Sequence, residues 1–312
     1  MLKISRSTYP LAVAIRAVTR LWHLPQSPRQ RLARLFFRFH EQPHYPFRVK
    51  SRGILYSGDF YEYLDWRVFF LGDFERESIN LCELLSSHIR NAAFVDIGAN
   101  KGLYSLVLAR LFSKVWAFEP LAQNVVKFKR DLELNHIDNV AIETYALGAE
   151  THVAEFNAPP DGNEGIGSFL PLDDQIPSVP VTLPVRNGDE ALSELGVTIG
   201  LAKIDVEGYE AFVLRGLVKT LARDRPFLVM EIGESSKAPL REAGGLRALL
   251  PPDYELFEIS DHSTAERFFL KPLRDDELLT REITNNLACP KEKLGIVEKY
   301  VRQNWRWAKT QA

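Results

Sequence analysis

The chain has 312 residues, of which 46% are hydrophobic and 26% are charged, which is typical of a soluble globular protein with a sizeable core. Its length allows one enlarged domain or one domain with an appendage. Two cysteines, Cys82 and Cys289, cannot form a disulfide framework or a zinc site by themselves, and no apolar run approaches the roughly 18 residues of a membrane span. These features favour a reducing, cytoplasmic location.

The net charge of -2 hides an asymmetry between the N-terminal arm and the rest of the chain. Residues 1–52 carry eleven Lys or Arg and one acid, which leaves 28 basic and 40 acidic residues in the remainder. An acidic body repels phosphates, so we expect no nucleic-acid partner.

Two short amphipathic helices are predicted in this arm, within residues 11–24 and 27–40. The predicted apolar faces consist of Leu11, Ile15, Val18 and Trp22 in the first helix, and of Leu32, Leu35, Phe36 and Phe39 in the second. We expect the pair to pack on the acidic globule, with its arginines in solvent. The alternative is peripheral contact of residues 1–40 with an anionic membrane or with a partner.

From residue 93 onward, predicted strands and helices alternate. In chain order, strands are predicted at 93–98, 114–120, 139–147, 153–159, 179–185, 200–208, 226–232, 254–260 and 267–273, with helices at 101–112, 121–137 and 210–222. This alternation predicts an α/β fold, with a mostly parallel sheet, helices on both of its faces and a closing antiparallel strand pair.

Acidic residues stand at the carboxyl ends of four predicted strands: Asp96, Glu119, Asp205 and Glu231. In such sheets the ligand binds at this edge, near the point where the strand order reverses. The four side chains should therefore converge on one rim.

The turn after the first of these strands reads Asp96-x-Gly98-x-x-x-Gly102, and Glu119 follows at the end of the next strand, where an acid can accept both ribose hydroxyls of a nucleoside cofactor. A dinucleotide site would need a Gly-x-Gly-x-x-Gly turn, and Asp96 would repel its phosphates. A cationic amino group fits Asp96 better, and S-adenosylmethionine carries one. The alternative is a glycine-rich turn in which Asp96 caps the next helix.

Several segments together resemble the FkbM family of S-adenosylmethionine-dependent methyltransferases: "FVDIGANKGLYSLVLA", "AFEP", "ALG" and above all "LAKIDVEGYEAFVLRG". The resemblance spans about residues 70–260. It implies a class I, Rossmann-like methyltransferase fold and O-methylation of a hydroxyl on a sugar, glycolipid, polyketide or related small molecule. The chain then divides into a basic arm (1–52), a methyltransferase domain (53–275) and a C-terminal extension (276–312). The chain departs from the family pattern at one place: many relatives have Leu-Asp-Asp where this chain has "VRNGDEAL", and Asp189 is the candidate for that position.

The resemblance also implies which residues form the site. Cofactor-binding roles fall on Asp96, Gly98, Asn100, Gly102, Tyr104, Glu119, Ala146 and Asp205. Weaker signals point to Ser168, in the loop "NEGIGSF", and to Glu75, in "GDFERE", as substrate contacts.

Catalysis depends on the motif "KIDVEG". Lys203 and Asp205 share one face of a strand, so we expect an ion pair there, extended to Asp96 or Asp189. Methyl transfer to a hydroxyl needs a base within hydrogen-bond reach, and the candidates are Asp205 and Glu207, followed by Glu231. The alternative is a purely structural ion pair, with Glu207 as a first-turn acid.

A divalent metal on Asp205, Asp189 and Glu231 is an alternative, since hard oxygen ligands suit magnesium, but no ligand spacing supports it strongly, and we expect no metal. His136, His152 and His262 are possible bases that cannot be placed from the sequence. The competing hypothesis from another functional class is a non-catalytic protein that kept the methyltransferase fold to bind a partner.

Overall fold

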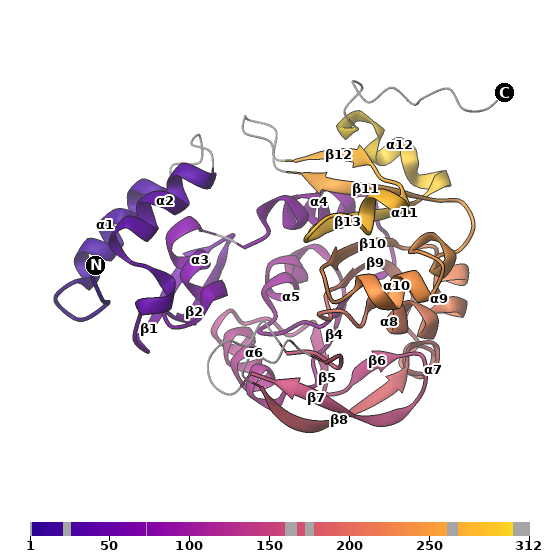
Figure 1. Ribbon diagram of the computed structural model, residues 1–312, viewed down its shortest axis with the longest axis horizontal. Coiled ribbons are helices and arrows are strands. Elements are labelled where there is room, and N and C mark those ends of the chain that lie inside the picture. Colours follow the sequence, from indigo (N-terminus) through magenta and orange to yellow (C-terminus); the bar gives the residue numbers. More distant parts are fainter. Residues whose placement is uncertain are drawn as a thin grey trace.

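The computed structural model describes residues 2–20, 26–72, 74–159, 167–171, 178–260 and 268–301. A small N-terminal lobe lies beside a larger α/β domain, at the left of the view in Figure 1. Among the described residues, none of the helices is long and apolar enough to cross a membrane.

An eight-stranded sheet forms the centre of the larger domain. Its order is β12 (Phe269–Pro272), β11 (Tyr254–Ser260), β13 (Thr284–Pro290), β10 (Phe227–Ile232), β9 (Ile199–Ile204), β3 (Ala93–Ile97), β4 (Val115–Phe118) and β5 (Val140–Glu143). The strands from β10 to β5 are parallel to one another, whereas β13 is antiparallel to both of its neighbours. The predicted closing pair is confirmed, because β11 and β12 are antiparallel.

Helices cover both faces of this sheet, as predicted. Phe94 of β3 packs in one apolar cluster with residues of α4 (Arg76–Ser86), α5 (Leu103–Leu108) and α6 (Ala122–Leu134). Its neighbour Val95 packs in a second cluster with residues of α7 (Gly188–Glu194), α8 (Glu210–Gly216), α9 (Val218–Asp224) and α10 (Lys237–Glu242). Because both faces are buried, the parallel strands are almost continuously apolar in sequence.

A three-stranded sheet lies apart from the central one and consists of β6 (Ala146–Gly148), β8 (Val179–Asn187) and β7 (His152–Ala158). The single strand predicted over 139–147 is therefore two strands. The chain leaves the central sheet after Glu143, and Ala146 pairs with Val185 of β8 instead.

The structure corrects the predicted domain boundaries at both ends. The C-terminal extension begins at residue 276 in the prediction, yet β13 lies inside the central sheet between β10 and β11, and its Leu287 and Ala288 are fully buried. At the other end, residue 52 lies in the turn that joins β1 (Pro46–Ser51) to β2 (Ile54–Asp59). The arm and the hairpin thus belong to one lobe.

The arm packs through its helices, but on this lobe rather than on the acidic domain. Helices α1 (Tyr9–Thr19) and α2 (Gln26–Phe36) contact each other and α3 (Tyr63–Leu71), and the short η1 (Phe39–Glu41) follows α2. The predicted faces are rotated: Ala12, Ile15, Ala33 and Phe37 are buried, whereas Leu11, Val18 and Leu35 are exposed.

Arginines explain this rotation. Arg29 is buried and donates hydrogen bonds to the carbonyl oxygens of Thr19 and Leu71, at the ends of α1 and α3. Arg16 donates to the carbonyl oxygens of Phe69 and Lys50. The expectation that the arginines of the arm are merely solvated is wrong for these two, because they donate to backbone carbonyls at the ends of α1 and α3 and, for Lys50, in β1.

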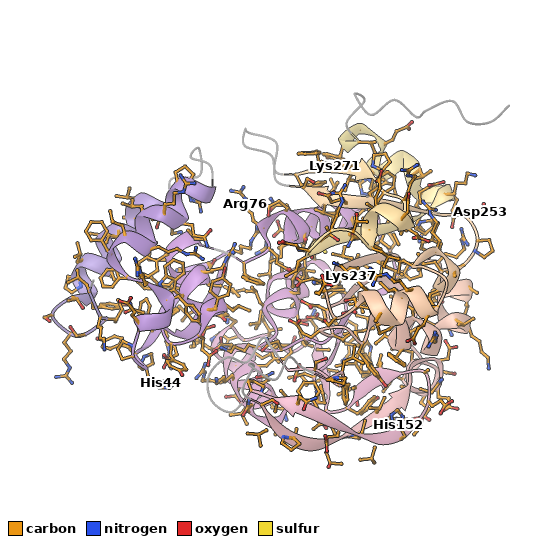
Figure 2. The ribbon with its side chains drawn as sticks, in the orientation of Figure 1. His44, Arg76, His152, Lys237, Asp253 and Lys271 are labelled. Carbon is orange, nitrogen blue, oxygen red and sulfur yellow. The ribbon has the colours of Figure 1, made fainter. Side chains whose placement is uncertain are left out.

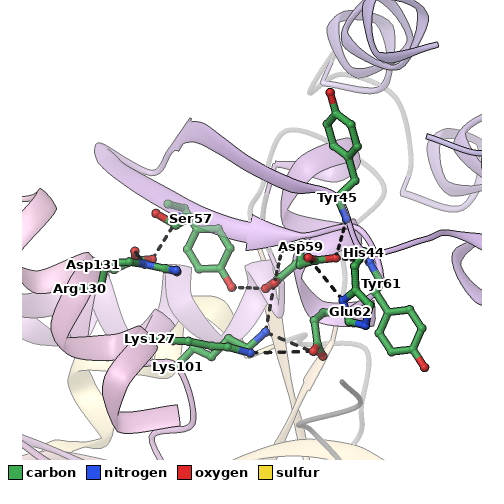
Figure 3. Close-up of polar contacts among 12 residues, drawn as sticks. His44, Tyr45, Ser57, Asp59, Tyr61, Glu62, Lys101, Lys127, Arg130 and Asp131 are labelled. Carbon is green, nitrogen blue, oxygen red and sulfur yellow. Dashed lines mark hydrogen bonds and ion pairs between the residues drawn. The ribbon is translucent and has the colours of Figure 1, made fainter. Parts of the chain in front are cut away.

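Polar contacts attach the lobe to the larger domain (Figure 3). Asp131 of α6 accepts a hydrogen bond from the backbone N–H of Ser57 at 3.0 Å. Lys101, in the turn after β3, donates to Asp65 at 3.0 Å and lies 3.9 Å from Glu62. The turn that the sequence associates with the cofactor is thus tied directly to the lobe.

We predict that Arg29→Ala lowers the free energy of unfolding by about 3 kcal/mol, because two hydrogen bonds from a charged donor are lost and two carbonyls lose a partner. Chemical denaturation followed by circular dichroism measures this. The control is Arg31→Ala, on the exposed face of the same helix. An equal, small effect of both substitutions would contradict the structural role of Arg29.

Candidate active site

A cavity of about 780 Å³ opens at the carboxyl ends of the central parallel strands. It lies where the strand order reverses between β3 and β9, the usual ligand site in such sheets. The predicted site residues that line it are Glu75, Asp96, Gly98, Asn100, Tyr104, Glu119, Ala146, Asp205, Glu207 and Glu231. The four acids at strand ends therefore converge on one rim, as expected.

Close packing explains the glycines of the turn after β3. Gly98 and Gly102 have φ values of +80° and +78°. A Cβ atom at Gly98 would lie 1.9 Å from the carbonyl oxygen of Asp205, and one at Gly102 would lie 2.1 Å from the ring of Phe128. Gly102 does not line the cavity, so its predicted cofactor contact is replaced by a steric role.

Asp96 is buried, and one of its carboxylate oxygens accepts hydrogen bonds from the backbone N–H and the hydroxyl of Ser105, at 3.1 and 2.6 Å. The predicted alternative, in which Asp96 caps the next helix, is therefore present for this oxygen, because Ser105 lies in the first turn of α5. The other oxygen makes no hydrogen bond within the described part of the chain. Burial raises the pKa of Asp96 to about 6, and the hydrogen bonds from Ser105 oppose this.

Glu119 holds the cofactor turn in place. Its carboxylate accepts hydrogen bonds from the backbone N–H groups of Asn100 and Leu121, at 2.8 and 3.0 Å, and from the side-chain amide of Asn124 at 3.2 Å. Burial raises the pKa of Glu119 to about 7.

Asn124 is a site residue that sequence reasoning missed. It lines the cavity from the first turn of α6, and its Oδ1 atom is buried without a hydrogen-bond partner among the described residues. The only signal in the sequence is a polar residue five positions after Glu119. An orphaned acceptor beside an acid fits the hydroxyl or amino groups of a nucleoside.

Lys203 organises the acidic rim. Its Nζ atom is buried at 3.2 Å from Asp205 and 3.4 Å from Glu75. The predicted pair with Asp205 is present, but its extension runs to Glu75. Asp189 is not part of the site: it accepts hydrogen bonds from the backbone N–H groups of Lys219 and Thr220.

Glu75, a weak candidate in the sequence, lies at the centre of the site. It accepts hydrogen bonds from Tyr104 at 2.7 Å and from Asn285 at 3.0 Å, and it shares a hydrogen bond with Glu231. Burial would raise the pKa of Glu75, but Lys203 and these hydrogen bonds lower it to about 2.

The pKa of Glu231 shifts in the opposite direction. Burial, together with Asp205 and the hydrogen bond to Glu75, raises its pKa to about 11. The two carboxyl groups therefore share one proton at neutral pH, held by Glu231. A carboxyl group that is already protonated cannot take up the proton of a hydroxyl, so these pKa values favour Glu207 over the predicted Glu231 as the base.

Glu207 retains the properties of a base. Its backbone has a φ of +50°, and its carbonyl oxygen accepts a hydrogen bond from the Ser168 hydroxyl at 2.7 Å. The carboxyl group lines the cavity and makes no ion pair or hydrogen bond within the described ranges. Burial, with Asp205 and Glu210 nearby, raises its pKa to about 8. Ser168 is buried outside the cavity lining, so its predicted substrate contact is replaced by support of Glu207.

Neither a metal ion nor a histidine is assigned to the site. Carboxylate oxygens of Glu75, Asp205 and Glu231 lie within 4.8 Å of one another, but the Lys203 ammonium already supplies a positive charge there, so we assign no metal ion. His152 is exposed on β7 (Figure 2), and His136 is exposed after α6. His262 lies outside the described residues.

Comparison with known proteins decides the family. Residues 96–258, just over half of the chain, match the model of the methyltransferase FkbM domain. The chain belongs to this family. Membership confirms the predicted family, the class I methyltransferase fold that the strand order displays, and S-adenosylmethionine as the cofactor.

The individual relatives share low sequence identity with this chain. The chain is 28% identical over 162 residues to "Methyltransferase 1" of Beauveria bassiana, a match that covers 45% of this chain and 64% of that protein's length. A methyltransferase FkbM structure from Methylobacillus flagellatus is 19% identical, with a TM-score of 0.39 and coverage of 65% and 45% of the two chains. A putative methyltransferase from Streptococcus mutans, solved in complex with SAH, is 14% identical, with a TM-score of 0.37 and coverage of 68% and 97%.

We predict that Glu119→Ala weakens S-adenosylmethionine binding about tenfold or more, because a charged hydrogen-bond acceptor is lost and the turn around Asn100 loosens. Isothermal titration calorimetry measures the dissociation constant. Glu133→Ala, on the exposed side of α6, is the matched control. Unchanged affinity in a folded Glu119→Ala protein would refute the assignment.

Proposed function

We propose that this protein transfers the methyl group of S-adenosylmethionine to a hydroxyl oxygen of a small-molecule or glycan acceptor. The observation that carries the proposal is the acidic rim beside the cofactor turn. Here Glu207 faces the cavity with a pKa near 8, next to the Lys203–Asp205 pair. A hydroxyl must lose its proton as it is methylated, and a carboxylate of raised pKa is suited to accept it.

The cofactor, when bound, supplies an electrophilic methyl group on a sulfonium. Glu207 accepts the proton of the acceptor hydroxyl, and its positive φ, supported by Ser168, aims the side chain into the cavity. Asp205 positions the acceptor hydroxyl, because it is held by Lys203 and keeps part of its side chain accessible to the cavity. Alignment of this kind can contribute roughly 7 to 11 kcal/mol of barrier lowering.

The charges of the rim suit a cationic donor. Lys203 is positive, Glu75 and Asp205 are negative, and Glu231 is neutral because it holds the shared proton. The cluster therefore carries one net negative charge beside the cofactor turn. Nearby negative charge favours binding of a sulfonium and disfavours a phosphate-bearing cofactor.

The competing hypothesis is a partner-binding protein that retained the fold without catalysis. Under it, S-adenosylmethionine can bind, but no acceptor receives the methyl group. Radiolabelled methyl transfer to a panel of hydroxylated sugars, glycolipids and polyketides separates the two hypotheses.

We predict that activity rises with pH through a value near 8, because Glu207 must be ionised to act as a base and its pKa is raised to about 8. Glu207→Gln should lower turnover by about 100-fold or more and abolish this dependence. The pH profile of kcat/KM measures it, with exposed Glu242→Gln as the control. An unchanged profile in Glu207→Gln would show that another group is the base.

The role of Asp205 has its own test. We expect Asp205→Asn to lower turnover by about 100-fold and to weaken cofactor binding far less than that, the pattern of an interaction used mainly in the transition state. Loss of a buried partner usually costs about 3 to 5 kcal/mol. Glu75 remains 3.4 Å from Lys203, so we expect a smaller loss of stability, measured by thermal unfolding.

The double variant Lys203→Met with Asp205→Asn provides the control. If Asp205 merely neutralises Lys203, this variant should regain turnover, since the ammonium that lost one of its two carboxylate partners is gone. A folded but inactive double variant agrees with a direct role of Asp205 at the acceptor.

A further inference from the structure

The cavity extends beyond the cofactor turn into the N-terminal lobe. Its outer wall includes Arg34 of α2, Phe39 of η1, Tyr63 and Arg67 of α3, and Phe74 before α4. These residues lie outside the segment that matches the family. An acceptor that fills this part of the cavity would contact elements that the family match does not describe.

Arg67 is held in place but has unused hydrogen-bonding capacity. Its guanidinium group lies 5.1 Å from the ring centroid of Phe74 and 5.7 Å from that of Tyr63, and it donates a hydrogen bond to the Tyr63 hydroxyl at 3.2 Å. Its Nε atom is buried and has no partner among the described residues. The rings fix the plane of the guanidinium, while no carboxylate of the described chain pairs with it.

Arg34 is the second cation of this wall. It is exposed, lines the cavity from α2, and makes no ion pair or hydrogen bond with the part of the chain that the structure describes. Two guanidinium groups that line one cavity, neither of them paired with a carboxylate of the described residues, attract an anion, and guanidinium binds carboxylate and phosphate in bidentate geometry.

The acids of the same wall are already engaged. Glu62 lies 3.9 Å from Lys101, and Glu77 lies 3.1 Å from Arg76. The outer wall therefore presents net positive charge, whereas the inner rim presents net negative charge.

We propose that the acceptor is a hydroxylated molecule with an oxyanion group, a carboxylate or a phosphate. Arg67 and Arg34 bind this group, and the hydroxyl to be methylated points toward Glu207. The aromatic rings of Phe39, Tyr63 and Phe74 offer apolar surface to the body of the molecule. This inference rests on the proposed O-methylation and adds the chemical class of the acceptor.

The opposite charges at the two ends of the cavity determine the orientation. A molecule that placed its oxyanion at the inner rim would meet Glu75, Asp205 and Glu207, and like charges repel. The same argument disfavours a cationic acceptor, which would be repelled by the outer wall. A neutral acceptor would leave both guanidinium groups without a counter-charge.

The test compares three matched probes: glucose, glucose 6-phosphate and glucuronate. Methyl transfer from radiolabelled S-adenosylmethionine and calorimetric binding to the protein loaded with S-adenosylhomocysteine are measured for the full chain. The variants are Arg67→Met, Arg34→Met and the control Arg31→Met, which is exposed on α2 outside the cavity lining. Glucose 6-phosphate and glucuronate distinguish phosphate from carboxylate as the oxyanion.

We expect at least one anionic probe to bind about tenfold or more tightly than glucose, and Arg67→Met or Arg34→Met to weaken it about 10- to 100-fold, as for lost hydrogen bonds to a charged group. Cofactor affinity and the Arg31→Met control should not change. Arg34 is exposed, so its variant should fold even if Arg67→Met does not.

Equal binding of all three probes, no binding of either anion, or anion binding that ignores both arginines would overturn the inference. Failure of the proposed function looks different: the anionic probes still bind in an arginine-dependent manner, but neither these probes nor any other hydroxylated acceptor receives the methyl group.

Discussion

The site depends on one buried ammonium group. Lys203 lies near the carboxyl end of a fully buried strand, where an unpaired charge would cost several kcal/mol, so the fold must bring carboxylates to it. Asp205 comes from the end of the same strand, and Glu75 comes from the start of α4. Glu75 has a left-handed backbone and is held by Tyr104 and by an asparagine of β13. The geometry of the acidic rim follows from this requirement.

A second constraint places the rim beside the cofactor turn. The Asp205 backbone N–H donates a hydrogen bond to the carbonyl oxygen of Ile97, and its own carbonyl oxygen occupies the space that a side chain at Gly98 would need. The turn and the rim therefore touch through the backbone. This contact fixes the spacing between the cofactor turn and the acidic rim through backbone atoms alone.

Much of the donor half of the site could be predicted from the sequence, because the geometry of parallel strands alone brings Asp96, Glu119 and Asp205 to one edge. The remaining contacts depend on long-range packing that no local pattern reveals. Asn285 donates a hydrogen bond to Glu75 although the two residues are 210 positions apart in the chain. It belongs to β13, in which two adjacent asparagines interrupt the apolar pattern that would indicate a buried strand.

The protonation states of the buried carboxyl groups could not be predicted from the sequence either. Glu231 occupies the predicted place, yet its role reverses because Glu75 shares its proton. The buried arginine of α2 misled the prediction in a similar way: the periodic pattern counted Arg29 as a solvent-facing residue, whereas backbone carbonyls at two helix ends hold it inside the lobe.

The ion pair between Lys101 and Asp65 joins the cofactor half of the cavity to its outer wall. Lys101 belongs to the cofactor turn, and Asp65 belongs to the helix that carries the outer wall. If cofactor binding stabilises this ion pair, it also stabilises the attachment of the lobe, and by thermodynamic reciprocity a ligand that stabilises the attachment favours cofactor binding by the same free energy. An acceptor bound as proposed and the cofactor would thus contact elements that this one ion pair joins.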